Sequence, residues 1–242
     1  MAPARVRAAP RTPSARRSTT GAGPATSLAA PFRDDVSSQR AFHLTHIDNL
    51  AGILRSGSIF APQSAGWDFA PAVDISSPST REGRRDAVVT ADVPVAEFVP
   101  FFLSPTANVW DDLRARRPSA RLSAAATAYH PSEFVLLVTT VDAVWSATPS
   151  VAVADGDAAA TTTRFAVTRE ESERMLRTLR ADPEQERLLD AELLVHGSVA
   201  FELITLVGVA HDKARTRVRE ILAGAAHSPK LAVFPPWFAP GE

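Results

Sequence analysis

The chain has 242 residues, no cysteine and a formal net charge of −1, and 45% of its residues are hydrophobic. This length fits one ordinary globular domain with a tail. The absence of cysteine excludes disulfides and thiolate metal sites. No apolar run reaches the roughly 18 residues of a membrane span, so we expect a soluble, cytoplasmic protein.

Residues 1–38 are rich in Ala, Arg, Pro, Ser, Thr and Gly and carry almost no large apolar side chain. Such a segment buries too little surface to offset its ordering entropy. Six arginines and two acids lie in residues 1–35, and subtracting this net +4 from the total of −1 leaves −5 for residues 36–242. A mildly acidic remainder argues against general duplex binding. We predict a disordered basic tail over 1–38, favoured over a targeting peptide, and a single domain over 39–242.

The first globular segment predicts a strand that runs into a helix. Residues 41–45 alternate as a short strand, and residues 47–54 place apolar side chains at helical spacing. Gly57 then stands where a helix commonly ends. Residues 62–83 are rich in Pro, Ser and Asp, which predicts a long loop.

Two apolar runs in the middle of the chain predict buried strands. Residues 98–105 (FVPFFLSP) have proline at their margins, and residues 133–141 (EFVLLVTTV) are typical of a central strand. Residues 155–167 begin with the turn signal DGD and continue as a short strand.

The last third combines two helices with two strands. Thr168 and Glu171 have the spacing of a capping box at the start of a helix. Residues 191–199 and 201–210 predict two apolar strands, and a final amphipathic helix ends at Gly224. Because strands and helices do not alternate regularly, we predict an α+β fold with a mixed or antiparallel sheet.

His43 and His46 form an H-x-x-H pattern, but metalloproteases need H-E-x-x-H on one helical face. Here the glutamate is absent and the segment changes from strand to helix between the histidines, so we do not expect a metal site. Phosphate-binding glycine loops and the G-x-S-x-G elbow are also absent from the sequence.

Glu192 stands at the start of an otherwise apolar strand. An ionised carboxylate in a buried strand is costly unless it is paired or used. Because strands alternate, Glu192 and His196 share one face. Two interpretations remain open: an edge strand whose polar face meets solvent, or a carboxylate that lines a cleft.

Two arginine clusters admit a functional and a structural interpretation. Arg81, Arg84 and Arg85 accompany a glycine and suit phosphate or carboxylate binding, although, taken alone, they are more typical of a solvated loop. A second group follows Trp110 and suits stacking on single-stranded nucleic acid, although, taken alone, it is more typical of a solvated helix face. Its members are Arg114, Arg116, Arg117 and Arg121.

Five blocks occur in one order within residues 41–222. They are FHLTHIDNLAGIL from residue 42, an arginine pair, FVPFFLSP from residue 98, DGDAAATTTRF from residue 155 and DAELLVHGSV from residue 190. Together they resemble the DarT family of DNA ADP-ribosyltransferase toxins. The resemblance implies an ADP-ribosyltransferase-like fold, in which two small mixed or antiparallel sheets with peripheral helices form a cleft for the substrate NAD, without a metal.

The resemblance also implies site residues. Glu192 corresponds to the catalytic glutamate, and either Arg84 or Arg85, with a slight preference for Arg84, to an arginine that contacts the NAD phosphates and assists proton removal. Residues 155–192 would form the loop that recognises the DNA substrate. The implied NAD-binding residues are His43, Leu44, Thr45, Asn49, Gly52 and Phe102, with His43 and Thr45 on the adenosine side and Phe102 near the nicotinamide.

The family pattern is kept better in the NAD-binding parts than in the acceptor-facing parts. Phe102 replaces a frequent tyrosine, Asp157 a frequent histidine, and residues 106–110 differ throughout. The target base, and DNA rather than RNA, therefore stay open. We expect an NAD-dependent transfer of ADP-ribose to a base in single-stranded DNA by a toxin or phage-defence effector, with a macrodomain antitoxin as partner. The alternatives are the same fold modifying RNA or protein, and an inactive nucleic-acid-binding module.

Overall fold

The computed structural model describes residues 35–67 and 70–240. Most of the predicted tail, 1–38, therefore lies outside the described residues. Its last residues do not: Val36–Ser38 form the 3-10 helix η1, and Val36 is 3% exposed within the main hydrophobic core. The folded part thus includes residues ahead of the predicted boundary at 39.

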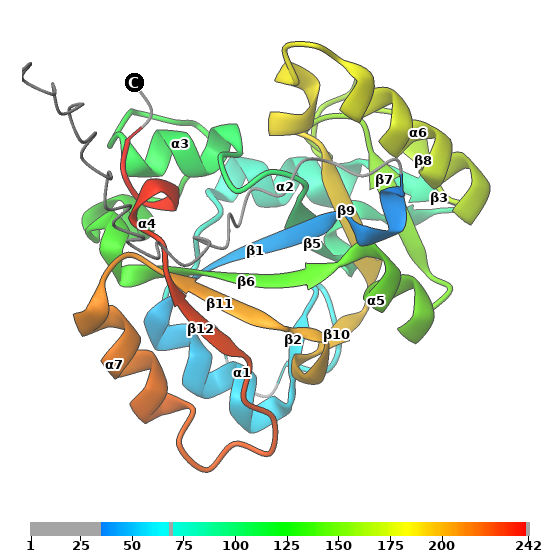
Figure 1. Ribbon diagram of the computed structural model, residues 1–242. Coiled ribbons are helices and arrows are strands. Elements are labelled where there is room, and N and C mark those ends of the chain that lie inside the picture. Colours follow the sequence, from blue (N-terminus) through cyan, green and yellow to red (C-terminus); the bar gives the residue numbers. More distant parts are fainter. Residues whose placement is uncertain (1–34, 68–69, 241–242) are drawn as a thin grey trace, which may run out of the picture. The chain divides into compact units, whose positions relative to one another are not determined.

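A single eight-stranded sheet organises the domain (Figure 1). Neighbouring strands are antiparallel except β11 and β12, which are parallel. In spatial order the strands are β12 (Lys230–Val233), β11 (Leu206–Val209), β6 (Phe134–Thr140), β1 (Arg40–His46), β5 (Phe98–Phe102), β9 (Glu192–His196), β7 (Val151–Ala154) and β8 (Phe165–Ala166). The predicted α+β class with a mixed sheet is confirmed.

The sheet is nearly divided between β1 and β5. These strands share one registered pair, Phe42↔Phe102, whereas β1 and β6 are paired from Arg40↔Thr140 to His46↔Phe134. Beyond that pair the two strands have no further registered pairing, so the sheet consists of two four-stranded halves that meet at β1 and β5. The two sheets expected from the resemblance are these halves, joined at one point.

The remaining elements surround the sheet. Two small ladders join β2 (Ser58–Phe60) to β10 (Ser198–Ala200) and β3 (Val88–Thr90) to β4 (Val93–Pro94). The helices are α1 (Leu50–Ser56), α2 (Pro78–Asp86), α3 (Asn108–Arg114), α4 (Ala124–Ala128), α5 (Val141–Ala147), α6 (Arg169–Ala181) and α7 (Asp212–Ile221). Arg217 of α7 pairs with Asp48, which lies just ahead of α1. Among the residues described, none of these helices has the length and apolarity needed to cross a bilayer.

Local signals explain most helix ends. Gly57 closes α1 with φ +70°, a left-handed conformation that glycine adopts without strain. Thr168 and Glu171 form the predicted capping box of α6. The predicted loop over 62–83 is wrong in its last part, because α2 begins at Pro78. The Ser77 side chain accepts the Thr80 amide there, and proline is favoured in the first turn of a helix.

The strand predictions also need correction in the last third. The predicted strand 191–199 is divided by Gly197, at φ +75°, into β9 and β10. The predicted strand 201–210 starts with the 3-10 helix η6 (Phe201–Leu203), and only Leu206–Val209 pair as β11. Strands β7 and β12 were not predicted. Both are four residues long, which is too short to give a clear periodicity.

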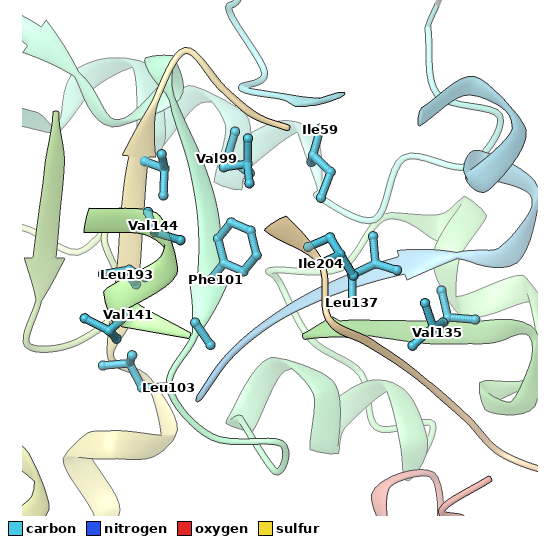
Figure 2. Packing of buried hydrophobic residues seen from close by; sticks show 14 of the residues in the cluster. Ile59, Val99, Phe101, Leu103, Val135, Leu137, Val141, Val144, Leu193 and Ile204 are labelled. Carbon is cyan, nitrogen blue, oxygen red and sulfur yellow. The ribbon is translucent and has the colours of Figure 1, made fainter. Parts of the chain in front are cut away.

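The hydrophobic core lies where both halves of the sheet meet the helices. Figure 2 shows the ring of Phe101 among aliphatic side chains, including Val99, Val144 and Leu193, all of which are fully buried. Each of the central strands β5, β6 and β9 contributes to this core. The core therefore fixes β5 and β9, the two strands that carry Phe102 and Glu192.

Candidate active site

A cleft of about 1170 Å³ opens between α1, α2 and the β1–β5 junction. All the residues that the sequence assigned to catalysis or NAD binding line it, although they come from five separate segments. They are His43, Leu44, Thr45, Asn49, Gly52, Arg84, Arg85, Phe102 and Glu192. The fold brings the predicted site together in one place.

Glu192 and Arg84 form a buried ion pair in the floor of this cleft. Arg84 Nη1 donates to Glu192 Oε2 at 2.9 Å and to Oε1 at 3.2 Å. Glu192 is 1% exposed and Arg84 7%. Because β9 lies between β5 and β7, the interpretation of Glu192 as a residue on a solvated edge strand is wrong. The carboxylate lines a cleft.

The Arg84–Glu192 pair leaves donors unsatisfied. Arg84 Nε and Nη2 are buried and have no hydrogen-bond partner among the described residues. The Glu192 carboxylate has an additional hydrogen-bond partner, because its Oε1 also accepts the Ala158 amide at 3.2 Å. A buried donor without an acceptor costs about 1–3 kcal/mol, and more when it is charged. The site therefore has guanidinium donors available for a further acceptor.

Arg84 and Arg85 are adjacent on α2 but lie in different environments. Helical residues one apart point about 100° away from each other, and Arg85 is exposed at the cleft while Arg84 is buried. Arg81, one turn earlier, pairs with Asp74 across the preceding loop. Of these arginines, Arg84 is the one that contacts Glu192.

His43 faces the cleft from β1 with a defined tautomer. Its Nδ1 lies 2.9 Å from the Pro100 carbonyl oxygen. Because a carbonyl only accepts, Nδ1 must carry the proton and donate it. Desolvation lowers the pKa of His43 below its ordinary value, and the bond to Pro100 opposes this only in part. The ring is therefore neutral at pH 7, with Nε2 available as an acceptor.

His46 lies on the opposite face of β1 from His43, as expected for a strand spacing of three. It is fully buried, its Nδ1 accepts the Asp48 amide at 3.2 Å, and its ring contacts Tyr129 and Phe134. Desolvation lowers its pKa as well. His46 is thus a structural residue at the helix entry. Within 35–67 and 70–240, no three His, Asp or Glu side chains are grouped as metal ligands.

Asn49 ties the strand end to the loop that crosses the cleft. Its Nδ2 donates to Thr45 Oγ1 at 3.1 Å and to the Val73 carbonyl at 2.8 Å, and its Oδ1 accepts the Val73 amide at 3.0 Å. Thr45 is 4% exposed. Gly52 follows on the cleft side of α1. These contacts shape the wall between β1 and the loop after β2.

The sequence missed an ionic cluster beside Glu192. Arg121 Nε lies 3.1 Å from Asp157 Oδ2, and Arg121 Nη1 lies 2.7 Å from Asp190 Oδ1. Asn108 Nδ2 also donates to Asp190 at 2.7 Å. In the order given, the partners of these three contacts are 36, 69 and 82 positions apart in the chain. No local pattern could therefore indicate their contact. The DGD turn at 155 was the only available signal.

The arginine cluster after Trp110 is not a stacking surface. Trp110 is 1% exposed and donates through Nε1 to the Trp237 carbonyl at 2.6 Å. Arg114 is 5% exposed, pairs with Asp111 and reaches the same carbonyl. A solvated helix face is equally wrong for Arg114. This part of α3 instead fastens the C-terminal segment to the sheet.

Comparisons with known proteins relate the chain to one family. Residues 42–239 match the family model described as "ssDNA thymidine ADP-ribosyltransferase, DarT". A protein of Mycobacterium tuberculosis named "DNA ADP-ribosyl transferase" is 26% identical over 196 residues, covering 75% of this chain and 80% of its own.

Two solved structures share the fold. Thermus sp. 2.9 DarT in complex with ADP-ribosylated ssDNA superposes with a TM-score of 0.70 at 23% identity, covering 83% of this chain and 96% of its own. The same protein in complex with NAD+ gives a TM-score of 0.65 at 21% identity, covering 83% and 98%. These likenesses extend over nearly the whole of the described domain.

Proposed function

The chain belongs to the DarT family of ssDNA thymidine ADP-ribosyltransferases, and we propose that its buried Arg84–Glu192 pair carries out the transfer. Membership makes the chain an enzyme that takes NAD as its substrate and modifies single-stranded DNA. From the family's description, we further propose that the acceptor is the base of thymidine.

One observation supports these roles above the others. Glu192 is a fully buried carboxylate on a central strand, paired with an arginine that keeps two unpartnered nitrogens. A binding module has no need for so costly an arrangement, because it binds phosphates with solvated arginines. A buried, paired carboxylate in a cleft is what a reaction with a cationic transition state requires.

The chemistry assigns each group a step. Breaking the bond between nicotinamide and ribose builds oxocarbenium character on the ribose, as in glycoside hydrolysis. We assign Glu192 to stabilising that cation and orienting the ribose hydroxyl. Nicotinamide departs with the bonding electrons, and a ring nitrogen of the base then forms the new bond to the ribose carbon.

The acceptor nitrogen must lose its proton as it attacks, so a base is needed within hydrogen-bond reach. We assign Arg84 to holding the NAD phosphates and assisting this proton removal. Because a guanidinium is already protonated and cannot accept the proton, we assign its acceptance to the Glu192 carboxylate that Arg84 contacts. His43 offers a neutral Nε2 to the cleft and suits a hydrogen bond to an NAD hydroxyl. Single-stranded substrate avoids the cost of extracting a base from a duplex.

The geometry supports Arg84 over Arg85 for the essential arginine, because only Arg84 contacts Glu192. Arg85 is exposed at the cleft and suits a DNA phosphate. For the remaining implied residues, we assign Thr45, Asn49, Gly52 and Leu44 to the wall of the NAD site. We assign Phe102, which is in register with Glu192, to packing against the nicotinamide.

An enzyme that modifies DNA bases damages its own cell unless the product is removed. We therefore propose a cytoplasmic toxin or phage-defence effector. Its partner would be a macrodomain antitoxin that hydrolyses the modification. This partner is inferred from the resemblance alone, since no surface of the described residues identifies it.

The test is transfer of label from NAD to defined acceptors. Purified protein is incubated with adenine-labelled NAD and, in separate reactions, with single-stranded oligonucleotides containing or lacking thymidine, a duplex, RNA and a protein mixture. Label on the thymidine oligonucleotide alone is expected. Label on RNA or protein only would favour the alternative acceptors, and label on none would support an inactive binding module.

The matched variant is Glu192→Gln, which keeps the size of the side chain but removes the charge. We expect it to bind NAD and to lose transfer. Label transfer at the normal rate with Glu192→Gln would remove Glu192 from its assigned role.

A further inference from the structure

The two halves of the sheet each carry part of the candidate site. His43 lies on β1, in the half made of β12, β11, β6 and β1, and Glu192 lies on β9, in the half made of β5, β9, β7 and β8. Among the described residues, a single backbone pair, Phe42↔Phe102, joins the two halves in register. A substrate that contacts both halves needs them at a fixed spacing, so further contacts between the halves bear on the reaction.

The C-terminal segment Phe234–Phe238 is fastened to the first half. The Phe234 amide donates to the Val209 carbonyl of β11 at 3.0 Å. The Trp237 ring packs edge-on against Phe42 of β1, with 5.4 Å between the ring centroids. In Figure 1 this segment, in red, lies beside α3. The Trp237 carbonyl is thus an acceptor that the first half of the sheet holds in place.

Helix α3 depends on that acceptor. It has only seven residues, and Ala107 at its N-cap supplies no side-chain hydrogen bond. A helix this short and without a cap is marginal by itself. Trp110 Nε1 donates to the Trp237 carbonyl at 2.6 Å and Arg114 Nη1 donates to the same oxygen at 3.3 Å, and both side chains are buried. These bonds hold α3 against the first half.

The first residue of α3 reaches the second half. Asn108 Nδ2 donates to Asp190 Oδ2 at 2.7 Å, and Asp190 stands two residues before Glu192. Ala191, between them, is buried, and its carbonyl accepts the Leu103 amide at 3.3 Å. With so few residues between them, a displacement of Asp190 also displaces Glu192.

We propose that α3 and the segment Phe234–Phe238 form a brace between the two halves of the sheet, in which Asn108 and Trp110 are positioning residues for Glu192. Both belong to residues 106–110, which differ from the family pattern, so the brace uses positions at which this chain departs from that pattern. The inference rests on the proposed function, because it takes Glu192 as the catalytic carboxylate.

The first experiment removes the donor of the Trp110 bond. Trp110→Phe keeps a buried aromatic ring and loses only the indole N–H. We expect kcat for transfer to the thymidine oligonucleotide to fall about 2- to 10-fold. The KM for NAD should change little, because His43 and the other assigned contacts on β1 and α1 stay in the first half. Trp145→Phe is the matched control: Trp145 packs under the Arg169 guanidinium, and its replacement should change neither constant.

The second experiment exchanges the two ends of the Asn108 bond. Asn108→Asp places two carboxylates in contact and should lower kcat about 5- to 50-fold. In the double variant Asn108→Asp/Asp190→Asn, the new amide at 190 can donate to the new carboxylate at 108, and its oxygen can still accept from Arg121. This exchange should restore most of kcat. A kcat that stays low in the double variant would remove the Asn108 bond from the brace.

The two bonds should act in series. If Trp110 acts by holding Asn108 in place, Trp110→Phe/Asn108→Asp should have the kcat of Asn108→Asp alone, whereas independent effects would multiply. Multiplied losses, or a normal kcat in either single variant, would overturn the brace.

Amide hydrogen exchange tests the brace without catalysis. Residues 186–191 should exchange faster in Trp110→Phe and in Asn108→Asp, and at the normal rate in Trp145→Phe and in the exchanged pair. Normal exchange together with a reduced kcat would refute the brace and make Asn108 a substrate contact. An unmodified chain that transfers no label refutes the proposed function, and the exchange rates then still show whether the brace exists.

Discussion

Arg84 and Glu192, 108 residues apart in the chain, meet at 2.9 Å in the floor of the cleft with both side chains buried. A buried ion pair seldom stabilises a fold more than apolar residues of the same volume would, but removal of one partner leaves an uncompensated charge. This pair is therefore better explained by the reaction than by the stability of the domain.

The stability of single and double variants tests this explanation. Glu192→Ala should lower the free energy of unfolding by about 3–5 kcal/mol, because Arg84 is left buried and unpaired. The double variant Arg84→Met/Glu192→Ala should lose much less than the sum of the single losses. Urea unfolding at pH 7.5 gives the free energy of unfolding of the unmodified chain, Arg84→Met, Glu192→Ala and the double variant. Additive losses in this cycle would show that the two side chains are not coupled.

Replacing Arg84 and replacing Arg85 should affect different steps. Arg84→Lys should abolish transfer even though the charge is kept, since lysine lacks the planar fork and reaches Glu192 differently. Arg85→Ala should keep NAD affinity but weaken single-stranded DNA binding. Its logarithmic salt slope should fall by about 0.7, the value for one phosphate contact. Transfer activity and DNA affinity at several salt concentrations are measured for each variant. An inactive Arg85→Ala together with a fully active Arg84→Ala would reverse the assignment.

The sequence reveals those parts of the molecule whose signal is local. The strand of His43, the capping box at Thr168 and the strand of Glu192 follow from spacing and propensity, and the resemblance supplied the site residues. The environment of Glu192 was ambiguous, because an edge strand and a central strand differ in their neighbours and not in their own residues. Only the sheet order places β9 between β5 and β7.

The errors have the same origin. The arginines of α2 were consistent with a solvated loop because the burial of Arg84 depends on Glu192, which is distant in sequence. Trp110 suited stacking until the chain end covered it through the Trp237 carbonyl. Arg121, Asp157 and Asp190 went unnoticed as a cluster for the same reason. Contacts between distant segments are what the sequence alone leaves undetermined.

Stability should fall as the pH decreases from 7.5 to 5.5. Desolvation lowers the pKa of His43 and of His46 in the folded state. Below about 6.5, the ordinary pKa of histidine, the unfolded chain binds protons that the folded chain does not, so unfolding is favoured until the folded pKa values are reached. Although burial opposes this, the pKa of Asp155 is lowered by its bonds to Arg164, and that of Glu171 is lowered by its hydrogen bonds from Thr168. Both carboxylates affect stability only at more acidic pH.

Urea midpoints at the two pH values measure this effect. His43→Asn keeps a donor near Pro100 but cannot titrate, so its midpoint should depend less on pH than that of the unmodified chain. A steeper dependence in His43→Asn would mean that His43 is charged in the fold.

Gly208→Ala should destabilise the domain through Trp237. A Cβ at position 208 would meet the six-membered ring of Trp237 at 2.7 Å, and that ring is 6% exposed and packs against Phe42. Overpacking of this kind costs about 1–3 kcal/mol. Denaturant unfolding of Gly208→Ala and of the unmodified chain measures this loss in the free energy of unfolding. The double variant Gly208→Ala/Trp237→Phe should lose less than the sum, since phenylalanine vacates the space, and a strictly additive loss would contradict the contact.

Arg121 should act on turnover by holding the loop beside Glu192. It pairs with Asp157 and Asp190, and although burial opposes its charge, these carboxylates raise its pKa above the ordinary value. It therefore stays charged at every working pH. Asp157 precedes Ala158, whose amide donates to Glu192. Without Arg121, we expect residues 155–164 to loosen and that bond to weaken.

Arg121→Ala should accordingly reduce kcat about 10- to 100-fold, the equivalent of one hydrogen bond to a charged group. The affinity for NAD should change little, and Arg121→Lys should be intermediate. Amide hydrogen exchange of residues 155–164 should rise in Arg121→Ala. Arg117→Ala is the matched control, because Arg117 pairs on the surface with Asp111 and Asp112 and should affect neither measurement. A lower kcat without faster exchange would mean that Arg121 contacts the substrate directly instead of holding the loop.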